Sequence, residues 1–192
     1  MTPQDVIGFW VDEVGEQHWY QGSVALDDKI RDRFLDAWQR ASELTAEWSD
    51  SPDGALASIL LTDQFPRNMF RDDSRSFATD MLARKLAQSA IDAGHDLELD
   101  PLLRQFVYVP FMHSEELGDQ NHCVALFKER LPEAESNLRH AKMHRDVIQT
   151  FGRFPWRNEA LGRETRPNER AFLDAGGYGA MVQGKLSLDG AH

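Results

Sequence analysis

The chain lacks several features that would place it outside a reducing compartment or in a membrane. It has 192 residues and one cysteine, Cys123, so it cannot form an intrachain disulfide. Its longest apolar run, Ala55–Thr62, is far shorter than the roughly 20 residues of a membrane helix. The N-terminus is polar and acidic and does not resemble a signal peptide. These absences predict a cytoplasmic protein with no membrane partner.

Positive charge is also scarce. There are 21 Lys and Arg residues against 32 Asp and Glu residues, which gives a net charge of −11. Nonspecific nucleic-acid binding requires a basic surface that neutralises phosphates, so we predict no nucleic-acid partner. In such an acidic chain, a local group of arginines would form a distinct cationic feature.

Motifs that hold cofactors or metals are missing as well. The sequence has no glycine-rich phosphate loop, no nucleophile elbow and no cluster of cysteines. His140 and His144 are spaced to share one helix face, as metal-binding pairs are, but the zinc signature His-Glu-x-x-His is absent. We therefore predict no cofactor and no metal.

What the sequence does contain is helical periodicity. Apolar residues recur every three or four positions, as in the run containing Ile30, Phe34 and Trp38, and no segment shows the alternation of a strand. This pattern predicts an all-α fold of antiparallel helix pairs. One long helix should begin at a cap formed by Asp27 or Asp28 and end near Trp48.

Further breaks follow from proline, serine and glycine. Pro110 should interrupt a helix, and the next helix should begin near Ser114, which is a good N-cap. We expect a single helical domain over residues 1–175. The glycine-rich segment 176–192 should form a flexible tail.

The most informative feature is a short phrase that occurs twice. Residues 63–68 read Asp-Gln-Phe-Pro-Arg-Asn and residues 153–158 read Arg-Phe-Pro-Trp-Arg-Asn. Each follows an apolar helical run, and proline there marks a helix end or kink that fixes the direction of the following Arg-Asn pair. Guanidinium groups suit carboxylate or phosphate, and asparagine can complete the hydrogen bonds. The resulting candidate ligand-binding residues are Arg67, Asn68, Arg71, Arg153, Arg157 and Asn158, with Arg163 beside them.

A structural role for these arginines is the alternative. They could pair with nearby carboxylates and cap helix C-termini, because most surface arginines form solvated ion pairs. The acidic residues close to them in sequence are Asp63, Asp72, Asp73, Glu159 and Glu164.

A second candidate site lies in residues 110–120, which read Pro-Phe-Met-His-Ser-Glu-Glu-Leu-Gly-Asp-Gln. His113 beside Glu115 has the composition of an acid–base pair. The alternative is that the acids only stabilise a helix start. His144 could orient a group near the second phrase, and Gln120 completes the set of candidate ligand-binding residues.

With these residues in hand, the chain resembles a bacterial family labelled domain of unknown function 924. The similarity extends from about Val6 to Leu173. The matching phrases are Phe9-Trp10, residues 63–68, residues 110–115, Asp119-Gln120, His144, residues 151–158 and residues 161–163. The resemblance implies a tetratricopeptide-like array of right-handed stacked helix pairs with a concave face, and it implies no activity. The family pattern usually has histidine where this chain has Trp156, which suggests a stacking or lid role for Trp156.

Three functions are compatible with these observations. The leading hypothesis is a binding protein whose Arg, Asn and His pocket takes a small anionic molecule or a peptide carboxylate. The second is a hydrolase or lyase in which His113 and Glu115 act on a phosphorylated or carboxylated substrate. The third is a protein-interaction scaffold. Trp19, Tyr20 and Tyr178 mark either a homodimer contact or core positions.

Overall fold

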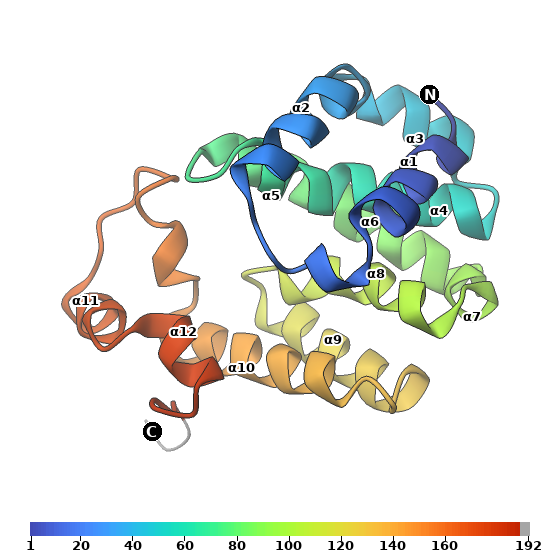
Figure 1. The fold of residues 1–192 in the computed structure, drawn as a ribbon. Helices are drawn as coiled ribbons and strands as arrows, with labels where there is room; N and C mark the ends of the chain where they lie inside the picture. Colours follow the sequence, from blue (N-terminus) through green and yellow to red (C-terminus); the bar gives the residue numbers. More distant parts are fainter. Residues whose placement is uncertain (189–192) are drawn as a thin grey trace. The chain divides into compact units, whose positions relative to one another are not determined.

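The computed structural model describes residues 1–188, and this part of the chain is helical without any strand (Figure 1). The predicted all-α class is therefore confirmed, whereas the tetratricopeptide-like stacking stays a prediction. Across residues 1–188, no helix combines the length and hydropathy that crossing a membrane requires. The described part of the chain divides into two compact units, residues 1–110 and the part from residue 111 to residue 188. The single domain expected over residues 1–175 stays a prediction.

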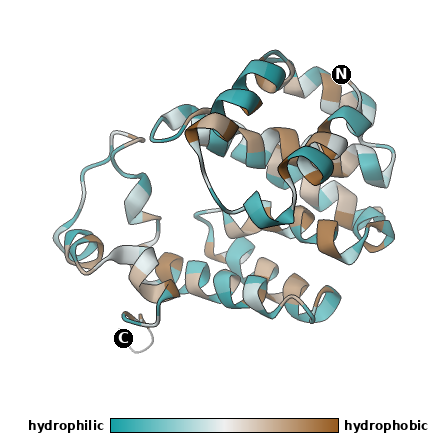
Figure 2. Ribbon diagram, in the orientation of Figure 1, coloured by the Kyte–Doolittle hydropathy of each residue, from teal (hydrophilic) through white to brown (hydrophobic). Residues whose placement is uncertain are grey.

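Unit 1 is built from short helices, two of which are π-helical. It comprises α1 (Pro3–Gly8), π-helix η1 (Phe9–Val14), η2 (Glu16–His18), α2 (Val24–Gln39), α3 (Ala41–Trp48), α4 (Pro52–Ile59), π-helix η3 (Leu60–Gln64), α5 (Phe65–Met69), η4 (Ser74–Phe77), α6 (Asp80–Asp92), α7 (His95–Glu98) and α8 (Pro101–Met112), whose last two residues belong to unit 2. The helix α4 packs against α1, α3 and α6, and α2 packs against α5. Hydrophobic and hydrophilic segments alternate along α2, as expected for a helix with one buried face (Figure 2).

Aromatic rings fill the core of unit 1. Phe9, Phe34 and Phe65 are fully buried and their rings contact one another, with centroids 4.6 to 5.9 Å apart. Trp10 and Trp19 pack on Phe106 in the same way. Such rings contribute large buried apolar areas, which stabilise the fold. Trp19 is therefore a core residue.

The predicted long helix is divided in the structure. Ser23, and neither Asp27 nor Asp28, is the N-cap of α2, since its hydroxyl accepts a hydrogen bond from the Leu26 N–H at 3.2 Å. Arg40 separates α2 from α3. Asp27 lies one turn inside α2. Its side chain therefore does not cap this helix and can contact a different one.

The first proline phrase does not end a helix. The chain passes from α4 through the π-helix η3 into α5, with Pro66 in the first turn of α5. Pro66 has no N–H to donate to the Thr62 carbonyl, and the Thr79 hydroxyl donates to that carbonyl instead, at 2.6 Å. The helical path therefore continues through the phrase until Phe70.

Unit 2 contains α9 (Leu117–Arg130), α10 (Glu135–Phe151), η5 (Pro155–Arg157), α11 (Pro167–Asp174) and α12 (Gly177–Val182). The helices α9 and α10 lie side by side after a short connection (Figure 1). The second phrase follows a true helix end, because α10 stops at Phe151 and Gly152 caps it with a left-handed φ of 72°. The two similar phrases thus adopt two different backbone conformations.

Three local expectations differ from the structure. Pro110 lies inside α8, two residues before the helix ends at Met112, and does not interrupt it; the helix lacks the one backbone hydrogen bond that a proline cannot donate. Ser114 is not the cap of α9, which begins three residues later; its hydroxyl instead donates to Asp119 at 2.6 Å. The expected tail contains helix α12, whose Met181 is buried with Met143 and Phe172 of the unit 2 core. Residues 189–192 lie outside the described part.

Gly54 is a position where a side chain should be harmful. A Cβ there would lie 1.7 Å from the Trp48 carbonyl oxygen, so α3 and α4 require glycine for their close approach. We expect Gly54→Ala to lower the free energy of unfolding by about 1–3 kcal/mol, since overpacking forces the backbone to shift. Urea denaturation measures this change.

The matched control for Gly54 is Gly118, near the start of α9. A Cβ at Gly118 would meet nothing within 4 Å. Gly118→Ala should be neutral or stabilise by up to about 1 kcal/mol, because alanine restricts the unfolded chain. Equal losses in the two variants would contradict the close-approach explanation.

Candidate functional site

The first Arg-Asn phrase is organised around a buried carboxylate of α2. Asp27, 6% exposed, accepts hydrogen bonds at Oδ1 from Asn68 Nδ2 and Arg71 Nη2, both at 2.9 Å, and at Oδ2 from Arg71 Nε. Burial raises the pKa of Asp27, but the hydrogen bonds from Arg71 and Asn68 outweigh it, so the net pKa is lowered. Asp27 is therefore ionised, and it fixes the direction of Arg71.

Gly22 completes this arrangement. A Cβ at Gly22 would lie 2.3 Å from Arg71 Nη2 and 2.6 Å from its Cζ, so the guanidinium group rests directly on the glycine backbone. Only glycine permits this contact without movement of Arg71.

Arg67 of the same phrase has different partners. Its Nη1 donates to the Asp63 backbone carbonyl at 2.6 Å and lies 3.3 Å from Asp63 Oδ1. Its Nη2 lies 3.0 Å from Asp80 Oδ1. The pairing of Arg67 with Asp63 is the structural alternative that the sequence suggested, and the contact with Asp80 ties α5 to the start of α6.

A cleft of about 530 Å³ lies over the Asp27 cluster, between α2 and the segment that runs from α5 to η4. Its charged and amide lining consists of Arg31, Arg71, Arg75, Asp27, Asp28, Asp73 and Asn68. Val24, Leu35, Met69 and Phe70 supply apolar surface. The volume lies within the about 300–1,000 Å³ that is usual for small-molecule sites. We call this cavity the α2–α5 cleft.

Each arginine of the α2–α5 cleft is held by one aspartate. Arg31 Nη1 donates to Asp28 at 2.7 Å, and its Nε donates to the Met69 carbonyl at the end of α5, at 3.1 Å. Arg75 forms two hydrogen bonds with Asp73, at 3.1 and 2.8 Å, and lies 4.5 Å from the centre of the Phe70 ring. The cleft is therefore lined by ion pairs with defined geometry. Their residues come from α2 on one side and from the segment between α5 and η4 on the other.

The second phrase surrounds another buried carboxylate. Glu169 of α11 accepts from Arg153 Nε at 2.6 Å, Arg153 Nη2 at 2.8 Å, Asn158 Nδ2 at 3.1 Å and the Arg166 N–H at 2.7 Å. The hydrogen bonds from Arg153, which outweigh burial, lower the pKa of Glu169 to about 2. Arg153 and Asn158 thus hold an internal anion, as Arg71 and Asn68 do in unit 1.

Glu115 is part of the same arrangement. Its Oε2 accepts from Arg163 Nη1 at 2.7 Å, and its Oε1 accepts from Arg163 Nη2 at 3.0 Å and from the Phe154 N–H at 2.8 Å. Burial raises the pKa of Glu115, but the bonds from Arg163 and Phe154 lower it further than burial raises it. Glu115 is therefore an ionised carboxylate engaged at both oxygens, and its role as the partner of His113 in acid–base chemistry stays a prediction.

Arg157, His113 and His144 come together beside the second phrase. Arg157 is 7% exposed, donates to the His113 carbonyl at 2.9 Å and lies 4.6 Å from the centre of the Phe154 ring. The His144 ring contacts the rings of Phe154 and Tyr178, with centroids 5.5 and 4.5 Å away. Three candidate residues from separate parts of the sequence therefore share one polar and aromatic cluster.

His144 is held as a neutral ring in this cluster. Its Nδ1 lies 2.9 Å from the His140 carbonyl oxygen and donates to it. Burial lowers the pKa of His144 to about 3, and the nearby charges of His113, His140 and Arg157 act in the same direction, while the bond to His140 opposes them. Burial also lowers the pKa of His140, whose Nδ1 is hydrogen-bonded to the Tyr178 hydroxyl. Tyr178 is thus a packing residue.

The Trp156 ring takes part in aromatic packing, and its expected stacking or lid role stays a prediction. Its ring stacks on Phe154 with centroids 4.7 Å apart and contacts His144 and Tyr178 at 6.0 and 5.5 Å. Trp156 is 38% exposed, so one part of its ring faces solvent. The homodimer expectation rests on exposed aromatic residues such as Tyr20, 64% exposed, and stays a prediction.

Gln120 has a backbone-capping role. Its side-chain amide nitrogen, Nε2, donates to the carbonyl oxygens of Met112 and Ser114, both at 2.7 Å. These bonds satisfy carbonyls left without partners where α8 ends. Nearby Cys123 is buried, and burial raises the pKa of its thiol, so it is a core residue.

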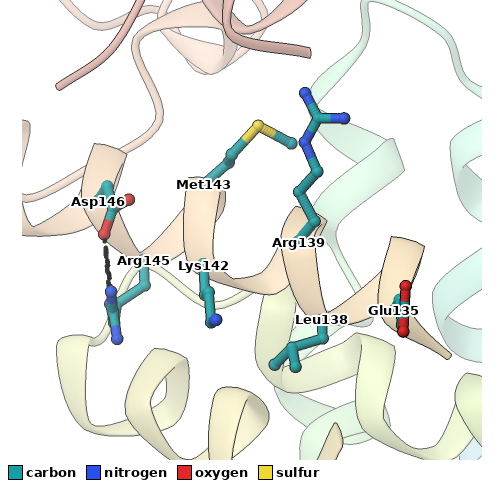
Figure 3. A pocket seen from close by; sticks show the side chains of 7 residues that line it. All are labelled: Glu135, Leu138, Arg139, Lys142, Met143, Arg145 and Asp146. Carbon is teal, nitrogen blue, oxygen red and sulfur yellow. Dashed lines mark hydrogen bonds and ion pairs between the residues drawn. The ribbon is translucent and has the colours of Figure 1, made fainter. Parts of the chain in front are cut away.

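A further hollow follows the outside of α10 and is lined by none of the candidate residues. Its lining consists of Glu135, Leu138, Arg139, Lys142, Met143, Arg145 and Asp146. Figure 3 shows that these side chains point in different directions along the helix, with Arg145 paired to Asp146. They do not converge on one point, as a binding site requires. Within residues 1–188, no group of three or more potential metal ligands occurs.

The comparisons with known proteins place the chain among relatives without an assigned activity. The profile of the family described as bacterial protein of unknown function (DUF924) matches residues 6–177. The chain belongs to this family. A solved structure described as a protein of unknown function from Agrobacterium tumefaciens is 40% identical and has a TM-score of 0.84, covering 90% of this chain and 96% of that one. No curated protein matches the sequence.

In this DUF924 protein, each of the two units thus brings together its own set of candidate residues. In unit 1, Asn68 and Arg71 meet at Asp27; in unit 2, Arg153 and Asn158 meet at Glu169. The expectation that both phrases face one shared site stays a prediction. Sequence reasoning missed Asp27 and Glu169 as partners, because each lies far along the chain from the phrase it serves and no local pattern marks it.

Proposed function

We propose that this DUF924 protein binds a small molecule through an anionic group of that molecule, in the α2–α5 cleft of unit 1. The observation that carries the proposal is the cleft itself, which gathers Arg31, Arg71 and Arg75 with Asn68 in a strongly acidic chain. The ligand would be a carboxylate or a phosphate, because the guanidinium fork matches both groups.

The arginines of the cleft have donors to spare. Arg71 gives Nε and Nη2 to Asp27, and Arg75 gives Nε and Nη2 to Asp73, so Nη1 of each remains for a ligand. A guanidinium carries more N–H donors than these bonds use. The aspartates orient the forks, and the remaining N–H donors would contact the anion.

The fixed geometry favours binding for a second reason. Arg71 is held between a buried carboxylate and Gly22, so a ligand need not restrict its side chain. A preorganised donor loses less side-chain entropy on binding than a mobile one does. The enzyme and scaffold hypotheses have no comparable support from the contacts of His113 and Glu115.

Arg75→Gln tests this function with little risk to folding. The Arg75 and Asp73 side chains are 60% and 38% exposed, so their ion pair contributes little stability. We expect about tenfold weaker binding of any anion that binds the wild type, as loss of one charge-assisted hydrogen bond costs about 1.5 kcal/mol or more. Isothermal titration calorimetry with phosphate, glycerol phosphate, succinate, carboxylic acids and amino acids measures the affinities.

The matched control is Arg40→Gln. Arg40 lies in the same unit, is 64% exposed and pairs with Glu43 outside the cleft. Its loss should leave affinity unchanged while altering net charge by the same amount. The proposal is wrong if no compound of the panel binds the wild type, or if the two variants bind equally well.

A further inference from the structure

We infer that the anion of the α2–α5 cleft is the carboxylate of a free α-amino acid, bound as a zwitterion. This inference rests on the proposed function and narrows it to one class of ligand. It follows from the charge balance, the apolar surface and the exposed ion pairs of the cleft.

The charge balance favours a ligand without net charge. The lining contains as many aspartates as arginines, and the chain as a whole carries a charge of −11. A simple anion would add negative charge to a lining that is already neutral and to an acidic protein. A zwitterion adds none, and its ammonium group can approach a carboxylate while its carboxylate approaches a guanidinium.

The aspartates at the rim can accept an ammonium group. Asp28 and Asp73 are 58% and 38% exposed, whereas Asp27 is enclosed by Asn68 and Arg71. An ionised carboxylate has several acceptor sites, so each can bind an ammonium while retaining one arginine bond. The carboxylate of the ligand would contact the guanidinium donors of Arg71 and Arg75 that the aspartates leave available.

Apolar surface next to these charges would hold the side chain of the amino acid. Val24 is 77% exposed and Leu35 is half-buried beside the buried Phe70. Covering exposed apolar area contributes about 25 cal/mol per Å². The cleft should therefore prefer an aliphatic amino acid over glycine.

The exposed ion pairs at the rim of the cleft can exchange partners with a ligand at a small cost in free energy. The pairs Arg31–Asp28 and Arg75–Asp73 are solvent-exposed, and such pairs contribute little to stability. The Arg71–Asp27 pair involves a buried carboxylate and would stay intact. The cleft thus has one fixed ion pair and two that can share their charges with a ligand.

Calorimetry with four related compounds tests the inference. L-leucine has both charges, 4-methylpentanoate has only the carboxylate, 3-methylbutylamine has only the ammonium, and N-acetyl-L-leucine resembles a peptide C-terminus. We expect L-leucine to bind at least tenfold more tightly than each of the other three. If 4-methylpentanoate or N-acetyl-L-leucine binds equally well, the inference is wrong and the proposed anion site stands.

Variants of the rim provide the second arm. Asp73→Asn and Asp28→Asn should each lower the preference for L-leucine over 4-methylpentanoate about tenfold, because they remove an ammonium acceptor. Asp32→Asn, an exposed change on α2 outside the cleft, should leave this preference unchanged. An unchanged preference in both rim variants would overturn the inference. Absence of binding by all four compounds would overturn the inference alone, and the proposed function is wrong only if phosphate and the other anions of the panel also fail to bind.

Discussion

The His144→Phe variant should lose much of the acid sensitivity of unit 2. Burial lowers the pKa of His144 to about 3 in the folded state, whereas an unfolded histidine titrates near 6.5. Below about pH 6.5, His144 therefore binds a proton in the unfolded chain but not in the folded protein. The free energy of unfolding then falls by about 1.4 kcal/mol per pH unit until the folded ring titrates near pH 3.

At pH 4.5 this effect amounts to about 2–3 kcal/mol in the wild type. Phenylalanine has no titrating group and can pack against Phe154 and Tyr178, so the variant should resemble the wild type at pH 7.5 and be more stable than it at pH 4.5. Hydrogen exchange of peptides from α10, measured from pH 7.5 to 4.5 and corrected for intrinsic rates, reports the stability of this helix. Some pH dependence will persist, because burial also lowers the pKa of His140.

His18→Phe is the matched control for this prediction. His18 is an exposed histidine of unit 1, so its loss should not change the pH dependence of α10. The explanation fails if His144→Phe and the wild type lose stability in parallel between pH 6.5 and 4.5. A constant offset at all pH values would show only a packing difference.

Glu169→Gln should destabilise unit 2 by about 3 kcal/mol. Glu169 is fully buried and receives hydrogen bonds from Arg153, Asn158 and the Arg166 N–H. The amide that replaces it presents N–H groups toward these donors and leaves the charge of Arg153 without its partner. Removing one member of a buried ion pair typically costs about 3–5 kcal/mol, and the residual solvent access of Arg153 places this case at the low end.

Urea denaturation at pH 7.5, with exchange of α10 and α11 peptides, measures the loss. Glu164→Gln is the control, because its exposed side chain is dispensable and only its backbone carbonyl accepts from Arg153, at 2.7 Å. Near pH 2 the wild type and Glu169→Gln should converge. The stabilisation by Glu169 is complete above its unfolded pKa of about 4.5 and is lost as pH falls toward its folded pKa of about 2. Similar losses in the two variants at pH 7.5 would contradict the role of the buried carboxylate.

Helical structure was largely predictable, because periodicity is a local property of the chain. The spacing of Ile30 and Phe34 identified one buried face of α2, and both side chains are fully buried. Boundaries were less certain where alternatives compete over a few residues. Ser23 precedes Asp27 by one turn and is the better-placed cap, and α8 continues through Pro110 to Met112 despite the missing N–H.

The candidate site was predictable only as a list of residues. The repeated phrase drew attention to Asn68, Arg153 and Asn158, with Arg71 close by, because these residue types can hold anions. The phrase did not indicate that the anions nearest to these residues are carboxylates of the protein itself. Asp27 and Glu169 are ordinary acids in the sequence, and only their burial beside an arginine makes them partners.

By itself, the sequence determined the all-helical class, the family and the residue types that can hold an anion, because these depend on local pattern and chemistry. The tertiary structure decided which carboxylate each arginine holds, that the two phrases stand on different backbones and that a cleft opens beside Arg71. Those outcomes depend on contacts between segments distant along the chain. Packing and desolvation, which select such contacts, act only once the helices have come together.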